Sequence, residues 1–188
     1  MTDALSQLIA AAQSQPMAAS EGRARALPPV HLWNPPRCGE IDILIRKDGL
    51  WMHEGTPIGR QELVRLFSTV LRRDEDGFYL VTPVEKLKVR VEDAPFVAVR
   101  VDRDGQTLRF TTNVADVVEA GPDHPLRVEM DEDTGEPRPY LHVRAGLEAL
   151  IARPVFYELV AMGSPQGGRL GVASNGVWFD LGPLEPAR

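Results

Sequence analysis

The segment RCGEID, residues 37–42, places a guanidinium, the only thiol of the chain and two carboxylates next to one another. A cysteine nucleophile needs a nearby base and surroundings that favour the thiolate, and Arg37 could supply part of this for Cys38. No histidine is joined to Cys38 by a recognisable motif, although His31 and His53 lie nearby in sequence. A hydrolase and a redox-sensing thiol are therefore alternatives to a simpler interpretation, in which Cys38 is a small buried residue where a strand begins.

Motifs for metals, phosphates and cofactors are missing from the sequence. The four histidines are scattered, without HxH or HExxH spacing, and there is no CxxC pair. Neither GxxxxGK[ST] nor GxGxxG occurs, and the acidic segments DEDG and DEDTGEP lack the spacing of calcium loops. The sequence thus predicts no metal and no cofactor, and it favours a non-catalytic protein while leaving an enzyme open.

Two segments have features that suit an anionic ligand. In TTNVAD, Asn113 is expected to cap a short helix through Val118, and the free N–H groups of a helix start attract phosphate or carboxylate. In EKLKVRV, alternation places a basic row on one face of a strand. A plain helix cap and a solvated strand face are the alternatives. The candidate ligand-binding residues are Arg37, Lys86, Thr112, Asn113, Arg144 and Tyr157.

Composition restricts the partners of this protein. The 188 residues carry a net charge of −6, with 26% charged and 43% hydrophobic residues, as in ordinary globular proteins. An acidic chain disfavours binding to nucleic acid and to anionic membranes, because both require clustered Lys and Arg. No apolar run approaches the ~20 residues that span a bilayer, and no signal peptide is recognisable. One cysteine excludes an internal disulfide and is consistent with the cytoplasm.

In the first half, periodicity predicts two helices and two pairs of strands. A helix capped by Thr2 is expected over 3–13, followed by a linker and by the proline-rich strap LPPVHLWNPP (27–36), packed through Val30, Leu32 and Trp33. IDILIR and LWMHE form a hairpin around Asp-Gly. Thr56 and Pro57 are then expected to start a helix with an apolar stripe, and after the polar loop RRDEDG two strands, FYLVTP and EKLKVRVE, complete this half.

The second half is expected to repeat this order. FVAVRVD and TLRFTT form a hairpin, LRVEM and RPYLHV are strands, and VRAGLEALIAR (143–153) has helical spacing. FYELV is expected as a strand, followed by GGRLGVAS and VWFDL around an Asn-Gly turn. Both halves then follow a ββαββ order, in which Arg60 matches Arg144, Leu63 matches Leu147 and Leu66 matches Leu150. The prediction is an α+β protein of two related halves with mainly antiparallel sheets, and chance recurrence is the alternative.

Long blocks of the chain resemble the bacterial domain of unknown function 1285 family. They include NPPRCGEIDILIRKDGLW, GTPIGRQELVRLFSTVLRRDEDGFYLVTPVEKLKV, VEDAPFVAV and TTNVADVVEAG, and the resemblance runs from about Pro28 to about Val160. It implies a duplicated core and a C-terminal half that superficially resembles pleckstrin-homology folds. It also implies a ligand site at the interface of the halves, for a nucleotide-like molecule in signal transduction. It supplies no catalytic residues.

These observations predict three segments, namely an N-terminal helix and linker (1–27), an N-terminal half (28–95) and a C-terminal half (96–188). The expected function is a cytoplasmic, non-catalytic ligand-binding or regulatory protein, with a small anionic ligand between its halves. The alternatives are a protein–protein adaptor and a hydrolase that uses Cys38 or a pair of carboxylates.

Overall fold

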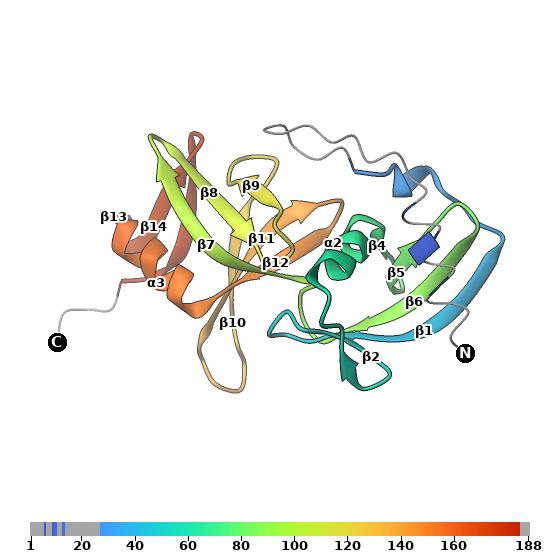
Figure 1. Ribbon diagram of the computed structural model, residues 1–188. Helices are drawn as coiled ribbons and strands as arrows, with labels where there is room; N and C mark the ends of the chain where they lie inside the picture. The colour runs from blue at the N-terminus through green and yellow to red at the C-terminus, as the bar shows by residue number, and fades with distance from the viewer. Residues whose placement is uncertain (1–5, 7–8, 11–12, 14–26, 185–188) are drawn as a thin grey trace. The chain divides into compact units, whose positions relative to one another are not determined.

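The computed structural model describes residues 6, 9–10, 13 and 27–184, and the chain divides into two compact units, Met1–Asp93 and Ala94–Arg188 (Figure 1). Each unit has its own apolar core, with one sheet in unit 1 and two sheets in unit 2. The four described positions before residue 27 are helical, as expected for the segment 3–13. The expected cap at Thr2 and the expected linker over 20–26 lie outside the described residues.

Unit 1 is built on a six-stranded sheet with the order β3-β2-β1-β6-β5-β4. The central strands β1 and β6 are parallel, and every other neighbouring pair is antiparallel. The helix α2 connects β3 to β4, and a short 3-10 helix, η1 (Val30–Leu32), precedes the sheet. The bounds are β1 (Arg37–Ile45), β2 (Trp51–His53), β3 (Thr56–Pro57), α2 (Gln61–Thr69), β4 (Leu71–Asp74), β5 (Gly77–Val81) and β6 (Glu85–Val91).

The core of unit 1 lies between the inner face of this sheet and α2. Alternation buries Ile43 and Ile45 of β1 completely, because successive side chains of a strand point to opposite faces. Trp51 of β2 stacks on Phe67 of α2 with ring centroids 6.4 Å apart. On β6, buried and part-exposed positions alternate over most of the strand. Its part-exposed and exposed row, Lys86, Lys88 and Arg90, confirms the basic row predicted from the sequence.

Unit 2 contains a six-stranded sheet with the order β10-β11-β12-β7-β8-β9 and a three-stranded sheet with the order β13-β14-β15. In the larger sheet the central strands β7 and β12 are parallel. The helix α3 packs near β7 and β14 (Figure 1). The bounds are β7 (Phe96–Asp104), β8 (Thr107–Thr112), β9 (Val117–Glu119), β10 (Leu126–Met130), β11 (Pro137–Arg144), β12 (Leu147–Ile151), α3 (Arg153–Met162), β13 (Ser164–Gln166), β14 (Arg169–Ser174) and β15 (Val177–Pro183).

The two larger sheets share one topology, so the chain is duplicated as predicted. Each consists of two three-stranded meanders, and the first strand of the first meander runs parallel to the last strand of the second. Strands β1 to β6 therefore correspond in order to β7 to β12. The helices do not correspond, because α2 lies between the meanders of unit 1 whereas α3 follows the second meander of unit 2.

The helix predicted over 143–153 is wrong. This segment forms the end of β11 and all of β12, joined by a turn in which Ala145 and Gly146 have φ angles of 44° and 76°. The buried residues Leu147, Ala149 and Ile151 alternate with half-buried neighbours, so the strand period decides the structure. The proposed equivalences of Arg60 with Arg144, Leu63 with Leu147 and Leu66 with Leu150 are wrong for the same reason.

Two further local predictions fail in unit 2. FYELV belongs to α3, which has Pro154 in its first turn and buries Val155, Phe156 and Leu159 on one side. The helix expected after Asn113 is instead a turn that leads into β9, with Ala115 at a φ of 66°.

In unit 1, Thr56 and Pro57 form the two-residue strand β3, and α2 begins only after Arg60. The expected polar loop RRDEDG contains most of β4, whose residues pair with β5.

Ser174 connects the two sheets of unit 2. Its fully buried hydroxyl accepts a hydrogen bond from Leu108 N (2.8 Å) and donates one to Ala120 O (2.7 Å). We expect Ser174→Ala to lower the free energy of unfolding by about 1–2 kcal/mol, because the Leu108 amide loses its partner in the core. Urea unfolding should show this loss, whereas Ala173→Ser, at the exposed neighbouring position, should change the midpoint little. Equal midpoints for Ser174→Ala and the wild type would contradict this role.

Candidate functional site

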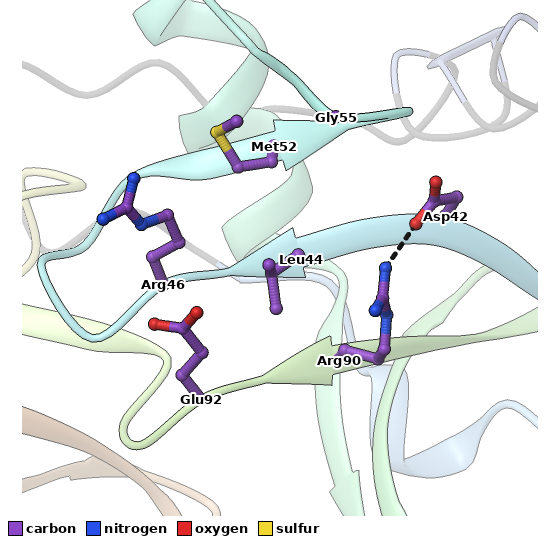
Figure 2. A pocket seen from close by; sticks show the side chains of 7 residues that line it. All are labelled: Asp42, Leu44, Arg46, Met52, Gly55, Arg90 and Glu92. Carbon is purple, nitrogen blue, oxygen red and sulfur yellow. Dashed lines mark hydrogen bonds and ion pairs between the residues drawn. The ribbon is translucent and has the colours of Figure 1, made fainter.

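A groove lies on the outer face of the unit 1 sheet, opposite the face that carries the apolar core. Its volume is about 430 Å³. The side chains come from neighbouring strands, because β2, β1 and β6 lie side by side in the sheet (Figure 2). The lining residues are Asp42, Leu44, Arg46, Met52, Gly55, Arg90 and Glu92.

An irregularity in β1 shapes the floor and one end of this groove. Glu40 pairs with Lys88 and Leu44 pairs with Arg90, so residues 41–43 of β1 lie opposite the single residue Val89 of β6. Extra residues in one strand bend it and change the direction of its side chains. The carboxylate of Asp42, within this irregular stretch, reaches Arg90 Nη2 at 2.5 Å.

The middle of the groove is apolar and its two ends are charged. Leu44 and Met52 are cross-strand partners and form the apolar part. Figure 2 shows the Asp42–Arg90 ion pair at one end and the side chains of Arg46 and Glu92 at the other. The lining therefore carries two positive and two negative groups, and its net charge is zero.

Backbone contacts hold the second charged end in place. The amide of Lys47 donates a hydrogen bond to Glu92 Oε2 at 2.9 Å. The amide of Glu92 donates in turn to Ile45 O at 2.9 Å, which continues the ladder past the end of β6. Arg46 lies 3.3 Å from Asp48 in the adjoining hairpin turn. An ionised carboxylate accepts several hydrogen bonds and a guanidinium offers five donors, so both groups can take a further partner.

Two of the residues expected to bind a ligand lie in unit 1. Arg37 is exposed at the start of β1, and its strand partner on β6 is Glu85. Lys86 forms an ion pair with Asp74, and its ammonium lies 3.8 Å from the ring centroid of Tyr79. The hydrogen bond to Asp74 raises the pKa of Lys86, so this lysine remains charged as part of a structural pair.

Three other expected residues, Thr112, Asn113 and Arg144, come together in unit 2. Arg144 forms an ion pair with Asp116, whose amide donates to Thr112 Oγ1 at 3.1 Å. The side-chain oxygen of Asn113 accepts a hydrogen bond from Val97 N at 3.0 Å. These contacts stabilise a turn, so the helix start on which the expected anion site depended is not present here, and the binding role of these residues stays a prediction. The sixth residue, Tyr157, lies on α3 with 61% of its surface exposed.

Cys38 is exposed, so the interpretation of a buried residue at the strand entry is wrong. It pairs with Lys86 in the parallel register of β1 and β6. Within residues 6, 9–10, 13 and 27–184, no group of three His, Cys, Asp or Glu side chains is arranged to hold a metal ion. None of the helices described there has the length and apolar character that crossing a bilayer requires.

The strap over 27–36 is tied to β4 by one arginine. Arg72 Nη1 donates to Val30 O (3.0 Å) and to Trp33 O (2.8 Å), while Nε and Nη2 bind the carboxylate of Asp74 at 2.8 and 3.0 Å. Pro35 is buried, but Leu32 is 71% exposed, so the prediction that Leu32 packs on the domain is wrong. Hydrogen bonds from Arg72 and then Lys86 lower the pKa of Asp74, despite its partial burial.

We expect Asp74→Asn to loosen the strap at neutral pH, because Arg72 loses the carboxylate that orients it. In the wild type the same loosening should follow acidification. The pKa of Asp74 is lower in the folded protein than the value of about 3.9 in the unfolded chain, so the ionised carboxylate stabilises the fold at pH values above about 3.9. This stabilisation is lost as the pH falls through the lower pKa of the folded state. The amides of Val30 and Trp33 donate to Pro28 O and Val30 O in the strap. Faster hydrogen exchange of these two amides in Asp74→Asn than in the wild type would confirm the loosening. Glu75→Gln, at the exposed next residue, is the control, and equal exchange in both variants would refute the role of Asp74.

Comparison with known sequences covers both halves. The profile of the N-terminal domain of the domain of unknown function DUF1285 matches residues 28–94, and that of the DUF1285 C-terminal domain matches residues 95–181. The chain belongs to the DUF1285 family. A DUF1285 family protein from Silicibacter pomeroyi DSS-3 has 51% sequence identity and a TM-score of 0.82, covering 95% of this chain and 96% of that one.

A second DUF1285 structure, from Shewanella baltica OS155, is more distant. It has 27% sequence identity and a TM-score of 0.54, and the match covers 64% of this chain and 91% of that chain. No curated protein matches this sequence. The DUF1285 descriptions name no activity or ligand, so the case for a function rests on the geometry of the chain itself.

Sequence reasoning missed the groove, although one signal was present. In IDILIR, the residues Asp42, Leu44 and Arg46 share the face opposite the buried isoleucines. The apolar Leu44 between two charged residues departs from the all-polar pattern typical of the solvated face of a sheet. Met52 repeats this signal on the neighbouring strand.

Proposed function

We propose that this DUF1285 protein is a non-catalytic binding or regulatory module, and that it binds a small ligand in the groove on the outer face of unit 1. The observation that carries the proposal is the groove itself, with the apolar pair Leu44 and Met52 between two charged ends. Small-molecule sites typically combine apolar lining with a few placed polar groups. The cytoplasm is the proposed location, in keeping with a single cysteine, which is exposed.

The composition of the groove favours a ligand that is polar at both ends rather than one that is purely anionic. The charges of the lining cancel, and the basic residues expected from the sequence to bind an anion, Lys86 and Arg144, are each engaged with an aspartate. A nucleotide-like ligand in signalling is the alternative, and it would bind outside this groove, with Lys86 or Arg144 as its expected contact.

A thermal-shift screen of the full-length protein tests the proposal. The panel contains amino acids, short peptides, nucleotides and cyclic nucleotides. A ligand at ~100 times its Kd adds about 2.7 kcal/mol, which for a chain of this size raises Tm by about 5–10 °C. We expect such a shift to be lost in Met52→Ala and kept in Leu50→Ala, an exposed residue of the adjoining hairpin. A shift that survives Met52→Ala but disappears in Lys86→Ala or Arg144→Ala would support the anionic alternative instead.

A protein–protein adaptor is the second candidate function. It is favoured by Tyr157 and Val160 on α3, which lie about one turn apart and are 61% and 37% exposed. Exposed aromatic side chains are common anchors in protein interfaces. A partner captured by the wild type but not by Tyr157→Ser would support this function, and the groove variants would leave that capture unchanged.

A further inference from the structure

We infer that the ligand of the groove is a short zwitterion with an apolar middle, of the size and charge pattern of an extended tripeptide. This inference rests on the proposed function, since it identifies the ligand class of the same site. It is drawn from three features of the lining, namely the charges at its two ends, the distance between these ends and the apolar pair between them.

The first feature is that each end of the groove offers both signs of charge. Asp42 and Arg90 form one end, and Arg46 and Glu92 form the other. A ligand with a single charge would satisfy one group at one end and leave the other end unused. A zwitterion can place its carboxylate beside a guanidinium at one end and its ammonium beside a carboxylate at the other, with charge-assisted hydrogen bonds at both.

The second feature is length. Arg90 and Glu92 are two residues apart, whereas Asp42 and Arg46 are four residues apart across the irregular part of β1 and its end. At about 3.3 Å per residue, the charged ends lie about 7 Å apart along β6 and no more than about 13 Å apart along the β1 side. An extended tripeptide spans about 10 Å between its termini, and the side chains of the groove can bridge the remainder. A free amino acid is too short to reach both ends at once.

The third feature is the apolar middle. Leu44 and Met52 lie directly opposite each other across β1 and β2, between the two charged ends (Figure 2). Methionine adapts its shape to irregular apolar partners, so this pair can accept side chains of different form. A tripeptide with an apolar central residue would place that residue on the pair while its termini reach the ends.

Titration calorimetry of the full-length protein with Gly-Leu-Gly tests this inference. We expect the free tripeptide to bind and its N-acetylated and C-amidated forms each to bind at least 10-fold more weakly, because each lacks one terminal charge. Arg90→Met and Glu92→Gln should weaken binding of the free form to a similar degree. Lys88→Met is the matched control, on the same face of β6 two residues from Arg90, and should bind normally.

The outcomes separate the ligand class from the proposed function. Equal binding of all three forms, lost in Met52→Ala, would overturn the zwitterion and leave the groove as the site. The same conclusion would follow if no tripeptide bound while another compound of the screen bound in a Met52-dependent manner. If no compound of the panel bound, or if every binder were indifferent to Met52→Ala, both the ligand class and the proposed function would fall.

Discussion

Gly171→Ala is expected to destabilise unit 2 strongly, because the added methyl group has no room. A Cβ at this position would lie 2.1 Å from Trp178 Cζ2 and 2.6 Å from Phe179 O. Real Cβ atoms do not approach other heavy atoms so closely, and here the neighbours are a rigid indole and a backbone carbonyl on the paired strand β15. The indole of Trp178 must leave its position, or β14 and β15 must separate.

We expect a loss of about 3 kcal/mol, the upper part of the range for overpacked sites. For a chain of this size the corresponding fall in Tm is about 6–12 °C. Gly59→Ala is the matched control, because its Cβ would meet no atom within 4 Å. A Tm for Gly171→Ala within 1–2 °C of the control, an interval well below the expected fall, would show that Trp178 does not pack on Gly171 as described.

The second large effect is expected for Arg144→Met. Arg144 and Asp116 form an ion pair in which the side chains are only 17% and 24% exposed, and the guanidinium carbon lies 4.9 Å from the ring centroid of Phe96. Methionine retains an apolar stem over this ring but leaves the carboxylate of Asp116 without its cation. Breaking one side of a buried pair is costly because the other charge stays desolvated, and with this partial burial we expect a loss of about 2–3 kcal/mol.

Two comparisons isolate the effect of the pair. Arg100→Met removes an exposed partner of Asp102 in the same unit, and such surface pairs contribute about 0–1 kcal/mol. Adding Asp116→Asn to Arg144→Met should recover part of the loss, since the unpaired charge is then removed. Urea unfolding of the four proteins measures these differences. A cost for Arg144→Met no larger than that for Arg100→Met would contradict the account of this turn.

The strands of unit 1 could be predicted because their period of two is clear. IDILIR and EKLKVRVE alternate between buried and exposed positions along most of their length, as expected. VRAGLEALIAR was misassigned because its apolar residues satisfy both periods, at i, i+4 and i+7 and also at alternate positions. The Ala145-Gly146 turn, which requires positive φ angles at both residues, decided between them.

The duplication illustrates what local patterns cannot determine. The expected repeat was aligned on helices, whereas the real one is aligned on strand pairing, in particular on the parallel pairs β1–β6 and β7–β12. These strand pairs join residues about 50 positions apart, so the local spacing of apolar residues cannot predict them. The expected ligand site between the halves stays a prediction. The groove was missed in part because Asp42, at one end of it, lies within an irregularity in strand register, which a single sequence does not reveal.

The most direct test of the groove is to map binding on the isotope-labelled full-length protein by NMR, with Gly-Leu-Gly and the best compound of the thermal-shift panel as ligands. We predict that the amides that shift on titration cluster at 42–46, 52–55 and 90–92, and that these shifts disappear in Met52→Ala. Shifts from a bound ligand that cluster elsewhere in the chain, with these three segments unchanged, would contradict the assignment of the groove as the functional site.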